Sequence, residues 1–403
     1  MNVEASKPGD TWLVLTVTLA IQAMVSMAML TVPAIAPAFA DRLGLPVSLL
    51  GVYVALLYIG AMTASLLSGP MVRRYGAIRV SQAGLILCSL GLGLVMLPVT
   101  PLVILGALLI GLGYGPITPA SSHLLARNTP AHRAGLVFSI KQTGVPLGGI
   151  LAGVVAPSLA LGSGIEAAIA AVIGLCLLSA WAAQPLRREH DADRQADTAL
   201  RLNGVLRPLR MVLSHQALRR LCGTSFVFSG VQLCLAGYLV TYLHTERDYS
   251  LIQAGVALSV AQVGGVIGRI IWGHIADRFL GATLTLITLS LMMAGSAAAT
   301  GLITGNAPVV LVLILVSLFG ASATGWNGVY LASVAKLAPE GMAGVATGGA
   351  LTVTFLGTLL LPLMFGLLSE AAGSLGSGYV LLALPILLCT LVLGRSWQEE
   401  KGA

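Results

Sequence analysis

The sequence predicts an all-α integral membrane protein with twelve transmembrane helices in two six-helix bundles that are related by a parallel repeat. Three observations predict this fold. Of the 403 residues, 57% are hydrophobic and only 9% are charged, whereas soluble domains carry about 25% charged residues. The apolar residues recur in runs of about 20 or more, which is the length that crosses a bilayer. The two halves of the chain also repeat one another.

The twelve predicted spans form two groups of six. They are expected at about 12–36, 47–69, 80–99, 101–125, 134–157 and 164–184, and then at 219–243, 251–274, 280–303, 308–334, 343–368 and 376–394. A long polar segment separates the groups. We therefore predict a first six-helix bundle in residues 1–184, a cytoplasmic linker in 185–218 and a second six-helix bundle in 219–403.

The positive charges predict the orientation. All 22 Lys and Arg residues except Arg42, Arg247, Lys141 and Arg269 fall on the side that holds the N-terminus. Since cytoplasmic loops carry the excess of Lys and Arg, both termini are predicted to be cytoplasmic. The alanine- and glycine-rich spans favour a bacterial inner membrane, crossed many times. The net charge of +7 reflects this loop placement, so no nucleic-acid partner is expected.

No cofactor, metal site or catalytic group is predicted. The five cysteines lack zinc-type spacing and are expected to be buried thiols. The stretch "GLGYG" (111–115) falls inside a predicted span and lacks the strand and the lysine of a phosphate-binding loop. An intramembrane hydrolase would need a nucleophile beside a base, or an acidic pair, and His123 is the only histidine within a predicted span apart from His274, the last residue of its span. An enzyme is therefore not expected.

An internal repeat supports the two-bundle arrangement. The stretch "HLLARNTPAHRAG" (123–135) aligns with "YLASVAKLAPEGMAG" (330–344), which keeps an alanine, a basic residue, a proline and a glycine in register. Upstream, "GPMVRRYG" (69–76) aligns with "GHIADRFLG" (273–281). Each half therefore has six helices in the same order and orientation, as in transporters that are built from parallel repeats.

The short loop after the second span of each half resembles the loop G-x-x-x-D-R-x-G-R-R/K of the major facilitator superfamily. The matching residues are Gly69, Arg74 and Gly76 in the first half and Gly273, Asp277 and Arg278 in the second. The resemblance covers essentially the whole chain and implies that these loops latch the two bundles on the cytoplasmic side. Arg73 stands where the family has an aspartate, so the first-half loop departs from the pattern. Arginines at this place would also occur as ordinary inside-loop charges.

Two cations fall inside predicted spans, several residues from either end. Lys141 lies about 10 Å and Arg269 about 8 Å from the cytoplasmic end of its helix, at 1.5 Å per residue. A charge at mid-bilayer costs at least ~2.5–3.5 kcal/mol, so it usually faces a cavity, a partner or a pathway. All fifteen acidic residues can be placed at helix ends or in loops. Two buried cations without a buried carboxylate predict an organic-anion site, with snorkelling or structural hydrogen bonding as alternatives.

Arg269 also carries a family resemblance. The stretch "GRIIWGHIAD" is similar to helix eight of monocarboxylate and oxalate–formate type members, which implies that Arg269 contacts a carboxylate. The monocarboxylate branch has an aspartate four residues before the arginine, and this chain has Gly265 there, so the proton-coupling role does not transfer. Gln262 is predicted to share a helix face with Arg269.

Other polar residues of the spans are predicted to line the same site. They are Trp326, Asn327, Tyr330, Tyr114, Thr118 and Gln142. An aromatic pair beside an amide suits an organic carboxylate with an apolar body. A wider group of polar residues could also line a pathway, and it includes Gln22, Ser26, Ser225, Ser229 and Gln232.

These observations predict a secondary active or facilitative transporter that moves a small organic anion, a carboxylate, by alternating access. The expected partners are that small molecule, the lipid bilayer and a co- or counter-transported ion, and a monomer is expected. The alternative is an exporter of neutral or amphipathic compounds. The stretch "TGVPLGG" (143–149) favours it, because it resembles the helix-five signature of family exporters.

Overall fold

The computed structural model describes residues 8–44, 50–195, 197, 206–304 and 307–402. Over these residues the chain is helical without a strand, and eleven helical stretches are long and apolar enough to cross a membrane. One stretch, Gln253–Gly301, contains two long helices, so each of the twelve predicted spans has a helical counterpart. The predicted all-α membrane fold is confirmed.

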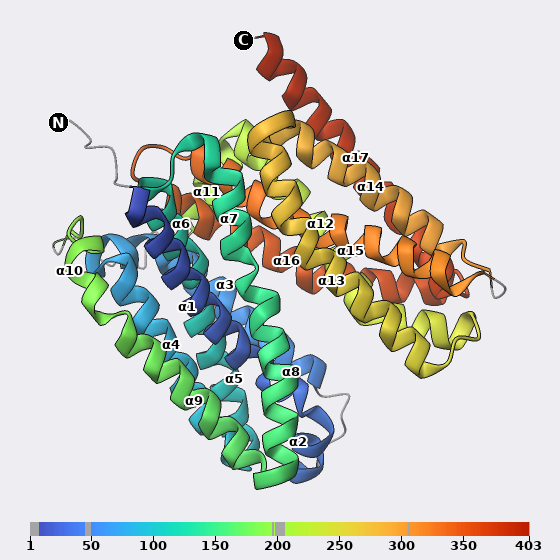
Figure 1. Ribbon diagram of the computed structural model, residues 1–403, viewed down its shortest axis with the longest axis horizontal. Coiled ribbons are helices and arrows are strands. Elements are labelled where there is room, and N and C mark those ends of the chain that lie inside the picture. Colours follow the sequence, from blue (N-terminus) through green and yellow to red (C-terminus); the bar gives the residue numbers. More distant parts are fainter. Residues whose placement is uncertain (1–7, 45–49, 196, 198–205, 305–306, 403) are drawn as a thin grey trace. The chain divides into compact units, whose positions relative to one another are not determined.

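The first half contains four unbroken spans and two that are split. The unbroken spans are α1 (Pro8–Ala34), α3 (Leu50–Tyr75), α4 (Ala77–Val95) and α9 (Ile165–Ala182). The split spans consist of α5 (Thr100–Tyr114) with α6 (Ile117–Asn128), and α7 (Ala134–Gln142) with α8 (Gly144–Ser163). Shorter helices are α2 (Ala36–Leu43), α10 (Arg187–His190) and α11 (Arg207–Ser214). Figure 1 labels these elements.

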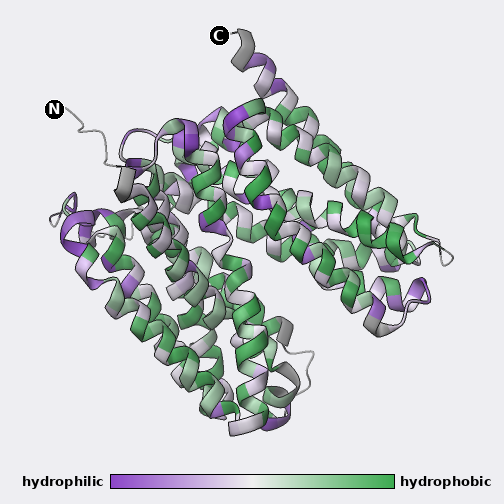
Figure 2. Cartoon of the chain, in the orientation of Figure 1, coloured by the Kyte–Doolittle hydropathy of each residue, from purple (hydrophilic) through white to green (hydrophobic). Residues whose placement is uncertain are grey.

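The second half consists of long helices. They are α12 (Gln216–Glu246), α13 (Leu251–Ile275), α14 (Gly281–Gly301), α15 (Val309–Leu337), α16 (Ala343–Ala371) and α17 (Leu375–Gly402). A π-helical turn, η5 (Ala276–Leu280), joins α13 to α14. In both halves hydrophobic residues run along the long helices, and hydrophilic residues gather towards helix ends and connections (Figure 2).

The chain divides into two compact units. Unit 1 comprises Met1–Thr129, Lys141–Val212 and Ala338–Thr352, and unit 2 comprises Pro130–Ile140, Leu213–Leu337 and Val353–Ala403. Within unit 1, α8 packs on α1, and α5 packs on α3 and α4. Within unit 2, α13 packs on α15, and α14 packs on α17. The domain boundaries predicted from the sequence stay predictions.

Proline explains both split spans. Proline has no backbone N–H, so the carbonyl four residues before it loses its helical partner. Pro146 removes the partner of the Gln142 carbonyl, and α7 ends at Gln142. Pro116 follows the end of α5 and occupies the N-cap position of α6. The first of these breaks places a helix end in the middle of a membrane span.

Candidate functional site

Lys141 occupies the last turn of α7, next to this break. The C-terminal end of a helix carries a partial negative charge, which favours a cation there. Its side chain is only 1% exposed. The backbone geometry thus offers a favourable electrostatic place for a lysine inside a span that would otherwise penalise it.

Three neutral oxygens surround the Lys141 ammonium. Its Nζ donates to Gln22 Oε1 at 2.8 Å, to Gln142 Oε1 at 3.0 Å and to Thr118 Oγ1 at 3.2 Å. These partners are all residues of unit 1: α1 supplies Gln22, α6 supplies Thr118, and Gln142 is the last residue of α7. The side chain is therefore held inside unit 1, which differs from a lysine that extends along the lipid face. Amide and hydroxyl oxygens hold the ammonium without cancelling its charge.

Gln22 is the hub of this cluster. It is fully buried, and its Oε1 also accepts a hydrogen bond from Thr118 Oγ1 at 3.0 Å. Its Nε2 donates to Ser26 Oγ at 3.3 Å, one turn further along α1. Gln22 and Ser26 appeared in the sequence only within a wider group of polar residues. An amide in the middle of an apolar span was the available signal, and nothing in the sequence ranked it above the others.

Glycines bring α8 close to α1 beside this cluster. A Cβ on Gly148 would lie 2.3 Å from the Ala23 carbonyl oxygen, and a Cβ on Gly144 would lie 2.8 Å from that of Leu19. Small residues at membrane helix interfaces allow such backbone approach. The glycines of the stretch that resembles an exporter signature thus have a packing role here.

Arg269 lies on α13 in unit 2 and is 3% exposed. Its Nε donates to the carbonyl oxygen of Thr324 on α15 at 3.1 Å. Asn327 Nδ2 donates to the same carbonyl at 3.3 Å and to Gln232 Oε1 at 3.2 Å. The structure therefore brings two predicted site residues, Arg269 and Asn327, to one acceptor. Gln262, which was predicted to share their site, is exposed.

Gly265 explains why no acidic residue precedes Arg269. A Cβ at this position would lie 2.1 Å from Thr324 Oγ1. A Cβ on the neighbouring Gly264 or Gly268 would likewise lie 2.5 or 2.6 Å from a backbone oxygen of α15. The position that holds an aspartate in the monocarboxylate branch is therefore a point of close helix packing in this chain.

The aromatic residues of α15 are buried in unit 2. Trp326 is 1% exposed, and its Nε1 donates to the Ala323 carbonyl oxygen at 2.9 Å. Its ring packs edge-on against Phe228 and Tyr330, with centroids 5.7 and 5.4 Å away. Tyr114, at the end of α5 in unit 1, is half-buried and neighbours Tyr58.

The second-half loop residue Asp277 caps a helix. Its carboxylate accepts hydrogen bonds from the backbone N–H groups of Gly135 and Leu136 at 2.8 and 2.7 Å, at the start of α7. An acceptor and a negative charge at a helix N-terminus are both stabilising. A Cβ on Gly273 would lie 2.4 Å from Ser139 Oγ, so this glycine also permits close packing on α7. Arg278 is exposed.

The first-half loop is built differently. Gly69 lies within α3, where a Cβ would meet Val345 Cγ2 at 2.5 Å. Gly76 has φ +92 and caps α4. The Arg73 carbonyl oxygen accepts the N–H of Gln195 at 2.7 Å, and the guanidinium of Arg74 lies over the Tyr75 ring at 5.5 Å. The loop therefore packs on α16 and on the start of the linker.

Asp191 of the linker caps α4, and sequence reasoning did not single it out. Its carboxylate accepts the backbone N–H groups of Ile78 and Arg79 at 2.8 and 3.0 Å. Burial raises the pKa of the Asp191 carboxyl, against the opposing effects of these two hydrogen bonds and of Arg187. More than a hundred residues separate the partners, so no local pattern could have revealed the contact.

Curated relatives were found at low identity. An uncharacterised MFS-type transporter of Mycobacterium tuberculosis is 24% identical over 92% of this chain and 82% of its own length. The hexuronate transporter of Bacillus subtilis is 23% identical over 60% of this chain and 58% of its own length. The gentisate transporter of Corynebacterium glutamicum is 24% identical over 72% of this chain and 66% of its own length. The chain thus spans less than two thirds of the length of the hexuronate and gentisate transporters.

Solved structures share the fold. The fucose:proton symporter of Escherichia coli superimposes with a TM-score of 0.78 at 16% identity, over 96% of this chain and 99% of that one. A human organic anion transporter also gives a TM-score of 0.78, at 17% identity, over 96% and 100%. The family model described as Major Facilitator Superfamily matches residues 16–362. The protein is therefore a multi-pass membrane protein that belongs to the Major Facilitator Superfamily, a family of transporters.

Proposed function

We propose that this protein moves a small organic carboxylate across the bacterial inner membrane by alternating access. The observation that carries the proposal is the buried lysine cluster of unit 1, in which Lys141 is held by Gln22, Thr118 and Gln142. The chain has no acidic residue between Asp41 and Glu166. A carboxylate that enters this unit therefore meets a fixed positive charge and no fixed negative one within that stretch.

The chemistry of the cluster suits a carboxylate. At an effective dielectric constant of about 20, an ammonium and a carboxylate 4 Å apart attract by ~4 kcal/mol. The amide groups of Gln22 and Gln142 provide both donors and acceptors, so they can exchange a bond to the lysine for a bond to a substrate oxygen. A neutral solute would gain only the hydrogen bonds, so the site is expected to prefer anions.

Arg269 is proposed as a further carboxylate contact, within unit 2. A guanidinium binds a carboxylate with two parallel N–H donors, whereas an ammonium acts as a point charge. The bond from Arg269 Nε to the Thr324 carbonyl oxygen fixes the guanidinium against α15. Asn327 Nδ2 donates to the same carbonyl oxygen and so adds an amide donor beside the Arg269 guanidinium.

The named relatives agree with this substrate class. Hexuronate and gentisate are both carboxylates, one on a sugar and one on an aromatic ring. The two relatives are only 23% and 24% identical to this chain, so they support the class of substrate and leave the compound open.

The test is carboxylate binding and uptake by purified protein. The melting temperature in detergent is recorded against a hexuronate, gentisate, benzoate and a matched neutral compound, because a ligand of the folded state raises it by mass action. Radiolabelled uptake of the best ligand into proteoliposomes follows. Lys141→Gln removes the charge and keeps a polar group, and the exposed Lys336→Gln is the matched control for lost charge.

We expect a carboxylate-induced shift in the wild type and in Lys336→Gln, and a loss of affinity of about 10-fold or more in Lys141→Gln, since a hydrogen bond to a charged group contributes ~1.5–3 kcal/mol. Arg269→Gln should weaken binding in the same direction. Shifts produced only by neutral compounds, unchanged in Lys141→Gln, would exclude the carboxylate site and favour an exporter of neutral compounds.

A further inference from the structure

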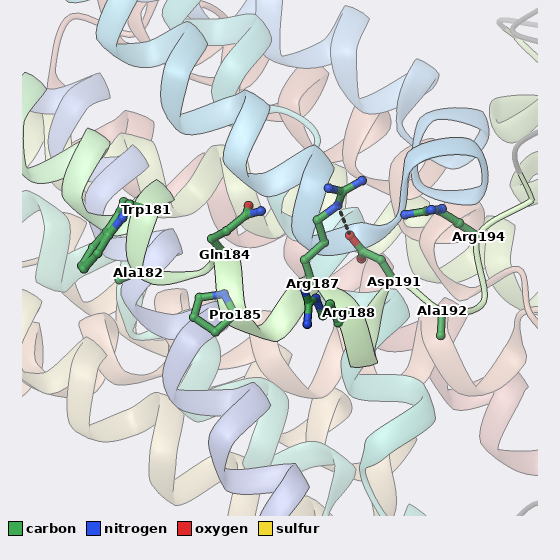
Figure 3. Close-up of a pocket in the computed structure, with 9 residues that line it drawn as sticks. All are labelled: Trp181, Ala182, Gln184, Pro185, Arg187, Arg188, Asp191, Ala192 and Arg194. Carbon is green, nitrogen blue, oxygen red and sulfur yellow. Dashed lines mark ion pairs between the residues drawn. The ribbon is translucent and has the colours of Figure 1, made fainter.

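The start of the linker forms a pocket in unit 1 that the proposed transport does not use. After α9 ends at Ala182, the chain turns through η3 (Gln184–Leu186) into α10. A cavity of about 1120 Å³ lies along this turn. The lining residues that matter here are Trp181, Gln184, Arg187, Arg188, Asp191 and Arg194 (Figure 3).

Hydrogen bonds hold this part of the linker in a fixed conformation. Gln82 Nε2, on α4, donates to Gln184 Oε1 at 2.9 Å and to the Ala180 carbonyl oxygen at 2.8 Å. Asp191 is 1% exposed and caps α4, as described above. The pocket arginines therefore project from a docked segment, which distinguishes them from a freely moving basic tail.

The pocket has an excess of positive charge and an unused donor. Three arginines line it, and its one carboxylate, on Asp191, already accepts two backbone N–H groups of α4. Arg187 Nε is buried and makes no hydrogen bond within the described residues, and its contact with Asp191 Oδ2 is an ion pair at the long distance of 4.0 Å (Figure 3). Because a buried donor is normally satisfied, this arrangement favours an oxyanion ligand.

The exposed face of α9 is apolar as far as Trp181, which lines the pocket. Leu177 is 45% exposed, Leu178 57% and Trp181 74%. Exposed tryptophans at the end of a membrane span are typical of the headgroup level. An acyl chain can therefore lie along α9 while its phosphate reaches the arginines.

From these observations we infer that the pocket binds the phosphodiester headgroup of an anionic phospholipid, with the arginines on the phosphate and the acyl chains along α9. Basic pockets at the membrane surface recognise anionic headgroups, and each arginine near such a surface contributes ~1 kcal/mol, or about 5-fold in affinity. The ligand is a lipid because a soluble phosphate would gain nothing from the apolar face of Leu178 and Trp181.

Quenching of Trp181 fluorescence by brominated lipid tests the inference. Delipidated full-length protein in detergent is titrated with dibrominated phosphatidylglycerol or dibrominated phosphatidylcholine, and the signal of Trp181→Phe is subtracted. The pocket variant is R187Q/R188Q. The control is R207Q/R210Q, which removes the same charge from exposed residues of the same polar segment.

We expect phosphatidylglycerol to quench Trp181 at far lower concentration than phosphatidylcholine. The half-saturating concentration should rise about 25-fold in R187Q/R188Q and change by less than about 2-fold in R207Q/R210Q. Because Arg187 lies near the Asp191 cap, Arg194→Gln serves as a second variant and should lose about 5-fold. Equal losses in the pocket and control variants, or no preference between the two lipids, would overturn the inference. If inorganic phosphate displaced the brominated phosphatidylglycerol at matched ionic strength, the pocket would be a site for a soluble anion, and the lipid inference would be overturned.

Discussion

Replacing Gly320 by alanine is expected to force α13 and α15 apart. A Cβ at this position of α15 would lie 1.9 Å from the carbonyl oxygen of Ala261 and 2.6 Å from its carbonyl carbon. Both atoms belong to the backbone of α13, so no side-chain rotation can make room. Since Cβ atoms essentially never come within 3.0 Å of such atoms, the helices must separate locally by about 1 Å.

The magnitude follows from packing energetics. Overpacking of a well-packed interface costs about 1–3 kcal/mol, and a gap of 0.5–1 Å already forfeits a quarter to a half of each local dispersion contact. Alanine returns up to ~1 kcal/mol through its higher helix propensity. We expect Gly320→Ala to lower the free energy of unfolding by about 1–3 kcal/mol. The bond between Arg269 Nε and the Thr324 carbonyl, one turn away on α15, should lengthen as well.

The assay is thermal unfolding in detergent, with Gly255→Ala as the control. Gly255 lies on α13, and a Cβ there would meet nothing within 4 Å, so its variant should be neutral or slightly more stable. Gly320→Ala should melt several degrees below both the wild type and the control. Equal melting temperatures for the two variants would show that the close approach of α13 and α15 contributes nothing to stability, and would refute this prediction.

Three further predictions concern the docked linker. Asp191→Ala removes an N-terminal cap, which contributes about 0.5–2 kcal/mol, so trypsin should cut the linker about 2- to 30-fold faster in limited proteolysis. Gly76→Ala should show the same phenotype, because its Cβ would lie 2.1 Å from Asp191 Cγ and its φ of +92 disfavours alanine; unchanged cleavage would contradict both. Burial opposes ionisation of Asp193, but the hydrogen bond to His123 and the nearby positive charges hold its pKa below the usual value. The ionised form therefore adds stability above about pH 4, and this stability is lost as pH falls through the pKa of the folded state. The difference in melting temperature between the wild type and Asp193→Asn should therefore shrink in acid. A difference that stays constant with pH would refute this prediction.

The sequence was sufficient for the fold because the bilayer imposes a simple rule. Backbone polar groups in hydrocarbon must be bonded within a helix, so apolar runs of about 20 residues convert directly into spans. The places where the helices break were less predictable. Pro146 removes one N–H, and α7 ends at Gln142, whereas Pro157, Pro362 and Pro385 lie inside helices that continue past them.

The contacts within the site were less accessible, because they depend on tertiary register. Lys141, Thr118 and Gln142 were predicted as site residues and share one cluster. Their hub, Gln22, comes from another helix, and a hydropathy pattern does not say which face of α1 meets α7. Gln262 is exposed on α13, and its predicted place in the site stays a prediction, because helical spacing aligns it with Arg269 but does not decide which part of α13 is covered.

The two intramembrane cations are stabilised in different ways, and this difference bears on their roles. Lys141 sits at a helix end that Pro146 creates, so the partial charge of α7 and three side-chain oxygens can support it. Arg269 lies in the interior of α13, where no such helix end exists, and it uses a carbonyl of α15 instead. Side-chain amides and hydroxyls can exchange partners by rotating, whereas the Thr324 carbonyl is fixed by its helix. The lysine cluster is therefore the more adaptable of the two, and we expect the carboxylate that we propose as substrate to act first on the hydrogen bonds of Lys141.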